Sequence, residues 1–183
     1  MHVASVTASE IRITLEVAIE LANQLVDGRF DGRRVPADAG FTRAPKASEA
    51  SIERLRTRID LLLPLITSLP GLDTETACAR VNEELTELPI SPAVVDHDGV
   101  GPHIHWTPAT ATFDDQVVSD VLMALAQELC EHGTARFGRC SASACDSLFY
   151  DATRNNSRRF CADRRCASRT HTADHRARRR SAV

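Results

Sequence analysis

At 183 residues, the chain is long enough for one ordinary folded domain and a small appendage. Hydrophobic residues make up 43% of it, yet no apolar run approaches the roughly 18 residues of a membrane-spanning helix. We therefore expect a cytoplasmic protein with no membrane partner.

The net charge of −3 is the average of two segments of opposite sign. Residues 1–135 carry ten basic and twenty-one acidic side chains, a balance of −11. Residues 136–183 carry twelve arginines and four aspartates, a balance of +8. So concentrated a positive charge favours a polyanionic partner, and the acidic segment cannot share that partner.

Four amphipathic helices are predicted in the first segment from apolar residues that recur at helical spacing. Ser48 and Asp73 stand where N-caps belong, and Pro64 either kinks or ends the second helix. The stretch over 28–47 reads as a long loop. Cys78 and Cys130 fall on helices and are interpreted as small buried hydrophobes. The first, third and fourth predicted helices span 9–26, 74–88 and about 115–131. The second is marked by apolar residues between Ile52 and Leu63.

A β-hairpin is predicted near 93–107, where an Asp-Gly turn joins two runs of β-branched, aromatic and alternating residues. Because strand side chains alternate, His103 and His105 point to one face, and His97 lies across the turn. These histidines are our candidates for ligand binding. Three interpretations stay open: a solvated polar face, a small-molecule site, or a catalytic metal centre.

Two Cys-x4-Cys pairs near the C-terminus, separated by fifteen residues, put four thiols within reach of one centre. Tetrahedral Zn²⁺ suits four thiolates best, and four sulfur ligands leave no position for a reactive water. The alternatives are disulfides, redox chemistry or scattered free thiols. Six cysteines in this length, with no apolar leader, weigh against a disulfide framework. We predict one structural Zn²⁺ and no enzymatic activity, with the ligands Cys140, Cys145, Cys161 and Cys166.

The residues around these cysteines resemble the CGNR zinc finger family over 136–180. The resemblance lies in the two cysteine pairs, in Leu148-Phe149-Tyr150-Asp151, and in the run from Thr153 to Cys161. It implies a zinc-binding finger that follows an N-terminal domain of the ABATE type. It also implies a role like that of the family's members, which look like bacterial, stress-induced transcription regulators.

Two departures from the family pattern stand near the last ligand. Ala167 and Ser168 occupy the positions of the family's Gly and Asn, and Phe160 replaces the usual indole. A glycine after the final ligand often serves a positive φ or a close backbone approach, and alanine makes either costly. The backbone after Cys166 is therefore the part of the motif that we expect to differ.

The expected fold class is α+β. A mainly helical domain with one hairpin over 1–135 precedes a small four-cysteine zinc finger with a basic tail over 136–183. The order of elements in the finger suits a treble-clef-like arrangement, with a strand or hairpin through 147–152 and a helix at or after the last cysteine pair. Its small core beside the ion is expected from Leu148, Phe149, Tyr150 and Phe160.

Two basic clusters are the predicted DNA contacts. Residues 167–180 lack Pro and Gly and, as a helix, would present cations along one side, whereas the second cluster precedes Cys161. In a major groove some of these side chains would reach base edges and most would hold phosphates. The alternative is a solvated basic tail. The predicted DNA-binding residues are Arg154, Asn155, Arg158, Arg159, Arg169, His171, His175, Arg176, Arg178 and Arg179.

The leading hypothesis is a zinc-dependent transcription regulator that binds double-stranded DNA. In this hypothesis the N-terminal domain senses a small-molecule effector or pairs subunits into a homodimer. The alternative is a protein- or RNA-interaction module, in which the basic finger docks an acidic surface such as the chain's own first segment.

Overall fold

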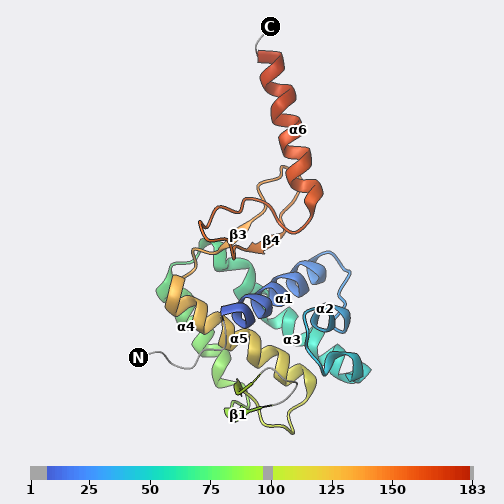
Figure 1. The fold of residues 1–183 in the computed structure, drawn as a ribbon, viewed down its shortest axis with the longest axis vertical. Helices are drawn as coiled ribbons and strands as arrows, with labels where there is room; N and C mark the ends of the chain where they lie inside the picture. Colours follow the sequence, from blue (N-terminus) through green and yellow to red (C-terminus); the bar gives the residue numbers. More distant parts are fainter. Residues whose placement is uncertain (1–7, 97–100, 182–183) are drawn as a thin grey trace.

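The structure, a computed structural model, describes residues 8–96 and 101–181. Within them it has the expected α+β composition, a helical body carrying two short antiparallel hairpins (Figure 1). The elements are α1 Ala8–Val26, α2 Arg34–Asp38, η1 Ala44–Lys46, α3 Glu49–Ser68, η2 Leu69–Gly71, α4 Thr74–Thr86, β1 Ala93–Val95, β2 His103–His105, α5 Phe113–His132, β3 Phe137–Arg139, β4 Leu148–Tyr150 and α6 Arg164–Ser181.

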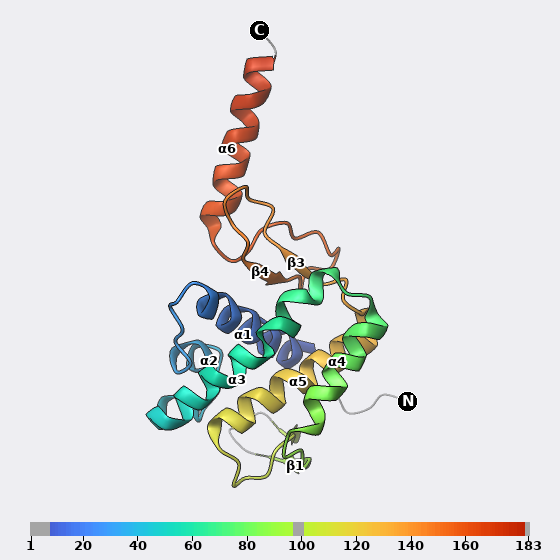
Figure 2. The same ribbon diagram turned by 180° about the vertical axis from the view of Figure 1, so that it is seen from behind.

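The body is a bundle in which α5 contacts α1, α3 and α4 (Figure 2). These are the four helices predicted from apolar periodicity, and the three whose bounds were predicted differ from them by at most two residues at any end. Their inward stripes form one hydrophobic core, whose burial is the main force that holds the bundle together. Its largest fully buried side chains include Leu15, Leu21, Leu55, Ile59, Leu65, Ile66, Leu69, Leu122 and Leu125.

Both predicted N-caps are present. The Ser48 hydroxyl accepts a hydrogen bond of 3.1 Å from the Ser51 N–H, and the Asp73 carboxylate accepts one of 2.8 Å from the Thr76 N–H. Each bond satisfies one of the N–H groups that the first turn of a helix leaves without a partner. The N-cap residues therefore correctly predicted where these two helices begin.

The structure settles one open point of the body and differs from the prediction in one other. Helix α3 continues past Pro64 to Ser68, so Pro64 does not end it. The predicted loop over 28–47 contains the short helix α2 and the turn η1. Proline and glycine punctuate this stretch too densely for a longer helix.

The two cysteines of the body lie in different environments. Cys78 is partly buried against the core, as expected of a small apolar side chain. The expectation for Cys130 was wrong, because its side chain is exposed. Cys130 follows the inward-facing Leu129 by one residue, and this turns it about 100° away from the core.

The second hairpin packs on the body and has no separate core. In its register Phe137 lies opposite Tyr150, and Gly138 lies opposite Phe149. Phe137, Tyr150 and Leu148 join the hydrophobic core of the bundle. The small core expected beside the ion is therefore incorrect for Leu148 and Tyr150, because alternation along β4 turns both toward α1 and α5 and leaves only Phe149 on the finger side.

Polar contacts reinforce this docking from both helices. The Asn23 amide, near the end of α1, donates to the Leu148 carbonyl at 3.0 Å and accepts from the Leu148 N–H at 2.8 Å. On α5, the buried Glu128 accepts a hydrogen bond of 2.9 Å from the Tyr150 hydroxyl. Burial and the neighbouring Glu128 carboxylate raise the pKa of Tyr150, so the phenol stays protonated and can donate.

The last helix, α6, projects from the finger away from the bundle (Figures 1 and 2). Its 18 residues give it a length of about 27 Å. None of the helices in the described residues is both long and apolar enough to cross a membrane. The molecule thus consists of an acidic bundle, a docked hairpin and a protruding basic helix.

Replacing Asn23 by alanine tests the polar clamp between α1 and β4. The Asn23→Ala variant loses both hydrogen bonds to Leu148, and we expect its free energy of unfolding to fall by about 1–3 kcal/mol. Urea denaturation measures this. The exposed Asn82 on α4 provides the matched control, because Asn82→Ala should change stability by less than about 0.5 kcal/mol. Equal stability of the two variants would contradict the clamp.

Candidate metal centre and basic helix

The four predicted ligands come together in one cluster. The Sγ atoms of Cys140, Cys145, Cys161 and Cys166 all lie within 4.8 Å of one another. Cys145 and Cys161 are 3.8 Å apart at sulfur, and Cys161 and Cys166 are 3.7 Å apart. All four are free thiols rather than disulfides. The sequence spacing therefore identified the members of the cluster correctly.

The spacing of the sulfurs fits zinc. A Zn–S bond of about 2.3 Å in a tetrahedron places neighbouring sulfurs about 3.8 Å apart. The observed separations of 3.7 and 3.8 Å agree with that edge length, whereas a disulfide would require about 2.05 Å. Four thiolates would complete the coordination sphere, so the ion acts as a structural cross-link.

Each ligand sits on a different local element. Cys140 directly follows β3, and its N–H donates to the Ser147 carbonyl at 2.9 Å, which closes the loop that carries Cys145. Cys161 lies in the segment that leads to α6, and Cys166 lies in the first turn of α6. The ion would therefore join the end of a hairpin, its loop and the base of the projecting helix.

The thiols differ in their affinity for protons. A hydrogen bond with Ser147 lowers the pKa of Cys145 to about 7, whereas burial raises the pKa of Cys166 to about 12. Burial also raises the pKa of Cys161. Because zinc binds thiolates, its binding releases protons from these cysteines, and acid weakens the site.

Asp151 organises the finger from its buried side and has no role that the sequence alone indicated. One carboxylate oxygen accepts from the Thr153 N–H at 2.8 Å, and the other accepts from the Arg158 N–H at 2.6 Å. Burial alone would raise the pKa of Asp151, but these hydrogen bonds and the nearby Arg136 lower it. The charged carboxylate thus holds the 151–158 loop closed.

Arg158, which we predicted as a DNA contact, is held inside the finger. Its guanidinium donates to the Phe160 carbonyl at 2.8 Å and to the Tyr150 carbonyl at 3.2 Å. The same group lies 5.4 Å from the centroid of the Phe149 ring. These contacts favour a structural role for Arg158, because two of its five N–H donors already bind carbonyls within the finger.

The other residues of that cluster are more open. The side chains of Arg154, Asn155 and Arg159 are exposed. The Arg159 guanidinium lies 5.8 Å from the centroid of the Phe160 ring. Exposure keeps all three available as contacts to a phosphate backbone.

Helix α6 begins at a capping aspartate. The Asp163 carboxylate accepts from the Arg165 N–H at 2.9 Å and pairs with its guanidinium. These interactions lower the pKa of Asp163 to about 2, so the cap keeps its charge well below neutral pH. A negative charge here also complements the helix dipole.

The backbone after Cys166 is helical, so Ala167 and Ser168 fit there in place of the family's Gly and Asn. Both residues lie within α6, and among the described non-glycine residues the one with a positive φ is Asn156, in the preceding loop. No glycine conformation is therefore required after the last ligand. Alanine at this place favours the helix.

Beyond its first turn, α6 is polar and exposed on nearly every side. Its base touches the rest of the finger through His171, whose ring centroid lies 5.8 Å from that of Phe160. At 100° per residue, Arg169, Arg176 and Arg180 fall within an arc of about 40° and form one stripe along the helix. The remaining predicted contacts on the helix, His175, Arg178 and Arg179, are also exposed.

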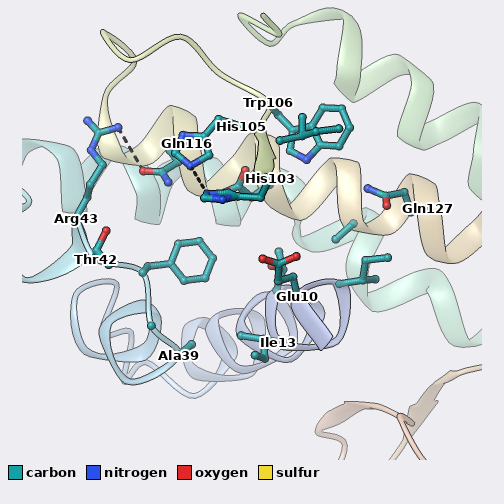
Figure 3. Close-up of a pocket in the computed structure, with 17 residues that line it drawn as sticks. Glu10, Ile13, Ala39, Thr42, Arg43, His103, His105, Trp106, Gln116 and Gln127 are labelled. Carbon is teal, nitrogen blue, oxygen red and sulfur yellow. Dashed lines mark hydrogen bonds between the residues drawn. The ribbon is translucent and has the colours of Figure 1, made fainter. Parts of the chain in front are cut away.

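Two of the predicted histidines of the first hairpin lie at a separate site, away from the cysteine cluster. His103 and His105 share a face as expected, with their Nε2 atoms 3.1 Å apart. Both are half-buried and line a cavity between β2, α1 and α5 (Figure 3), so the interpretation as a solvated outer face was wrong. His97 lies outside the described residues. Within the described part of the chain, the cysteine cluster is the group found with the geometry of a metal site.

Comparison with known proteins agrees with the metal geometry. Residues 136–179 match the model of the CGNR zinc finger family. The matched segment contains the four clustered cysteines and ends near the tip of α6. A search of curated proteins finds no match to the chain. The C-terminal segment is therefore a four-cysteine zinc finger, consistent with one structural zinc ion.

Metal analysis of single variants tests the ligand set. We expect the purified protein to hold one zinc per chain after dialysis against a weak chelator, because a structural site of this type contributes about 10–16 kcal/mol. Changing any one ligand to serine should release the zinc. The matched controls are Cys78→Ser and Cys130→Ser, which should retain it. Loss of zinc from the controls, or full retention by a ligand variant, would contradict the assignment.

Proposed function

We propose that the protein is a zinc-dependent regulator of transcription that binds double-stranded DNA through α6. The observation that carries the proposal is the geometry of this helix, an exposed arginine stripe fixed at its base by Cys166. The CGNR match of the same segment supports a regulatory role. Because four sulfur ligands would saturate the ion, we propose a binding function and no catalysis.

The charge of the finger favours a polyanion. Residues 136–183 carry a formal balance of +8, and four thiolates with one Zn²⁺ reduce it to +6. A helix that is polar all round has no apolar face to bury against another protein. The major groove of DNA is about 12 Å wide and admits an α-helix, and its phosphates would neutralise the stripe.

The alternative in which the basic finger docks on the chain's own acidic segment receives no support from the arrangement. Helix α6 points away from the bundle in both views (Figures 1 and 2). Its stripe of Arg169, Arg176 and Arg180 is exposed and open to an external partner. RNA remains a polyanion to be compared directly with DNA.

The bundle, by the same proposal, is an ABATE-type domain that senses a ligand, with pairing of subunits as its other role. Support comes from the two helices that line the cavity. Helix α1 contributes Glu10 to the cavity and Asn23 to the finger, and α5 contributes Gln116 to the cavity and Glu128 to the finger. A ligand that shifted α1 against α5 would therefore move the base of the DNA-binding helix.

Salt dependence tests whether phosphates are the target. If about seven phosphates are neutralised, the logarithm of duplex affinity should fall against the logarithm of salt concentration with a slope of about −6. Changing Arg169, Arg176 and Arg180 to glutamine should make the slope shallower by about 3. Fluorescence anisotropy with a labelled duplex measures both.

The control variant removes three exposed or half-exposed arginines of the bundle, Arg12, Arg34 and Arg56, and should keep the original slope. Affinity that is independent of salt, or an equal effect of the two triple variants, would contradict the proposal. Tighter binding of an RNA duplex than of a DNA duplex of the same sequence would support the RNA alternative.

A further inference from the structure

The cavity beside the first hairpin is large enough for a small organic ligand. It has a volume of about 510 Å³, within the usual range for ligand pockets. Its walls come from the start of α1, the segment over 39–43, strand β2 and the middle of α5. Figure 3 shows His103 facing Glu10 across the cavity, with Arg43 at one end and Gln127 toward the other.

Part of the wall is apolar and aromatic. Ile13, Phe41 and Trp106 line it, and none of them is fully buried, so their surfaces remain available to a ligand. Aromatic faces carry negative electrostatic potential and attract cations. Such a wall suits a ligand with a hydrocarbon or aromatic body.

Asp120 is the unusual polar group of the cavity. Its carboxylate lines the wall from α5, and within the described part of the chain no hydrogen bond or ion pair joins it to another residue. Burial, with nothing to offset it, raises the pKa of Asp120 to about 7. A half-buried carboxylate without a partner destabilises the fold, and a ligand cation would remove that cost.

Arg43, the arginine in the cavity wall, already forms hydrogen bonds within the protein. Arg43 donates to the Ala111 carbonyl at 2.7 Å and to the Gln116 side-chain oxygen at 3.3 Å. His103 has its Nδ1 2.9 Å from the Gly101 carbonyl, and its Nε2 meets His105. The cavity therefore presents the Asp120 carboxylate toward a ligand and, among its described lining residues, no uncommitted guanidinium, which disfavours an anion.

We propose that the cavity binds a small organic ammonium ion, whose charge pairs with Asp120 and whose apolar body contacts Phe41 and Trp106. The inference rests on the proposed sensing role for its biological meaning. It does not depend on DNA binding, because the site is complete within the bundle.

Three probes of similar size and different charge test the proposal on the full, zinc-loaded chain. They are 2-phenylethylammonium, the neutral 2-phenylethanol and the anionic phenylacetate. Trp106 is the single tryptophan of the sequence and lines the cavity, so its fluorescence reports binding directly. We expect the ammonium ion to bind at least tenfold more tightly than the alcohol and the anion to bind weakest.

The variant Asp120→Asn separates charge from shape. It should weaken binding of the ammonium ion at least tenfold and leave the alcohol nearly unaffected. Because it removes an uncompensated, half-buried charge, its melting temperature should be unchanged or raised. Asp60→Asn removes the same charge from an exposed site on α3 and should bind like the unaltered protein.

Three outcomes would overturn the proposal. They are the absence of a saturable response to the ammonium ion, equal affinities for the three probes, and unchanged ammonium affinity in a folded Asp120→Asn variant. The first two are read on the unaltered protein and do not depend on the variant. Duplex affinity measured on the same preparation shows separately whether the DNA-binding proposal holds.

Discussion

The structure of the finger depends on one interaction, the attraction of four thiolates to a single zinc ion. The hairpin supplies one ligand beside β3, the following loop supplies the second, and the segment around α6 supplies the other two. Few large apolar side chains surround the cluster, so hydrophobic burial cannot hold these pieces in place. The metal supplies the stability that a hydrophobic core supplies in larger domains.

The hairpin of the finger is nevertheless built into the bundle. Leu148 and Tyr150 join its hydrophobic core, while Asn23 and Glu128 bind the same strand through hydrogen bonds. The hairpin of the finger is therefore held in two ways. Hydrophobic packing attaches it to the bundle, and the shared zinc ion attaches it to α6. This arrangement gives a protruding, charged helix a fixed direction relative to the body.

Features that depend on residues close together in the sequence were predictable from the sequence. Helices with an apolar stripe, the N-caps Ser48 and Asp73 and the grouping of the four cysteines follow from spacing and local hydrogen bonding. Tertiary features were not. The burial of Tyr150 in the bundle depends on the twist and placement of β4, and the commitment of Arg158 to backbone carbonyls depends on a loop closed by Asp151. The cavity beside His103 required the packing of four separate segments.

We propose that zinc fixes α6 in the position from which it would bind DNA. The most direct test is the affinity of the full chain for a DNA duplex, measured before chelation, after chelation and after zinc is restored. The account predicts a loss of at least about 100-fold, equivalent to about 2.7 kcal/mol, that zinc reverses. Affinity that stays the same when the metal is removed would contradict it.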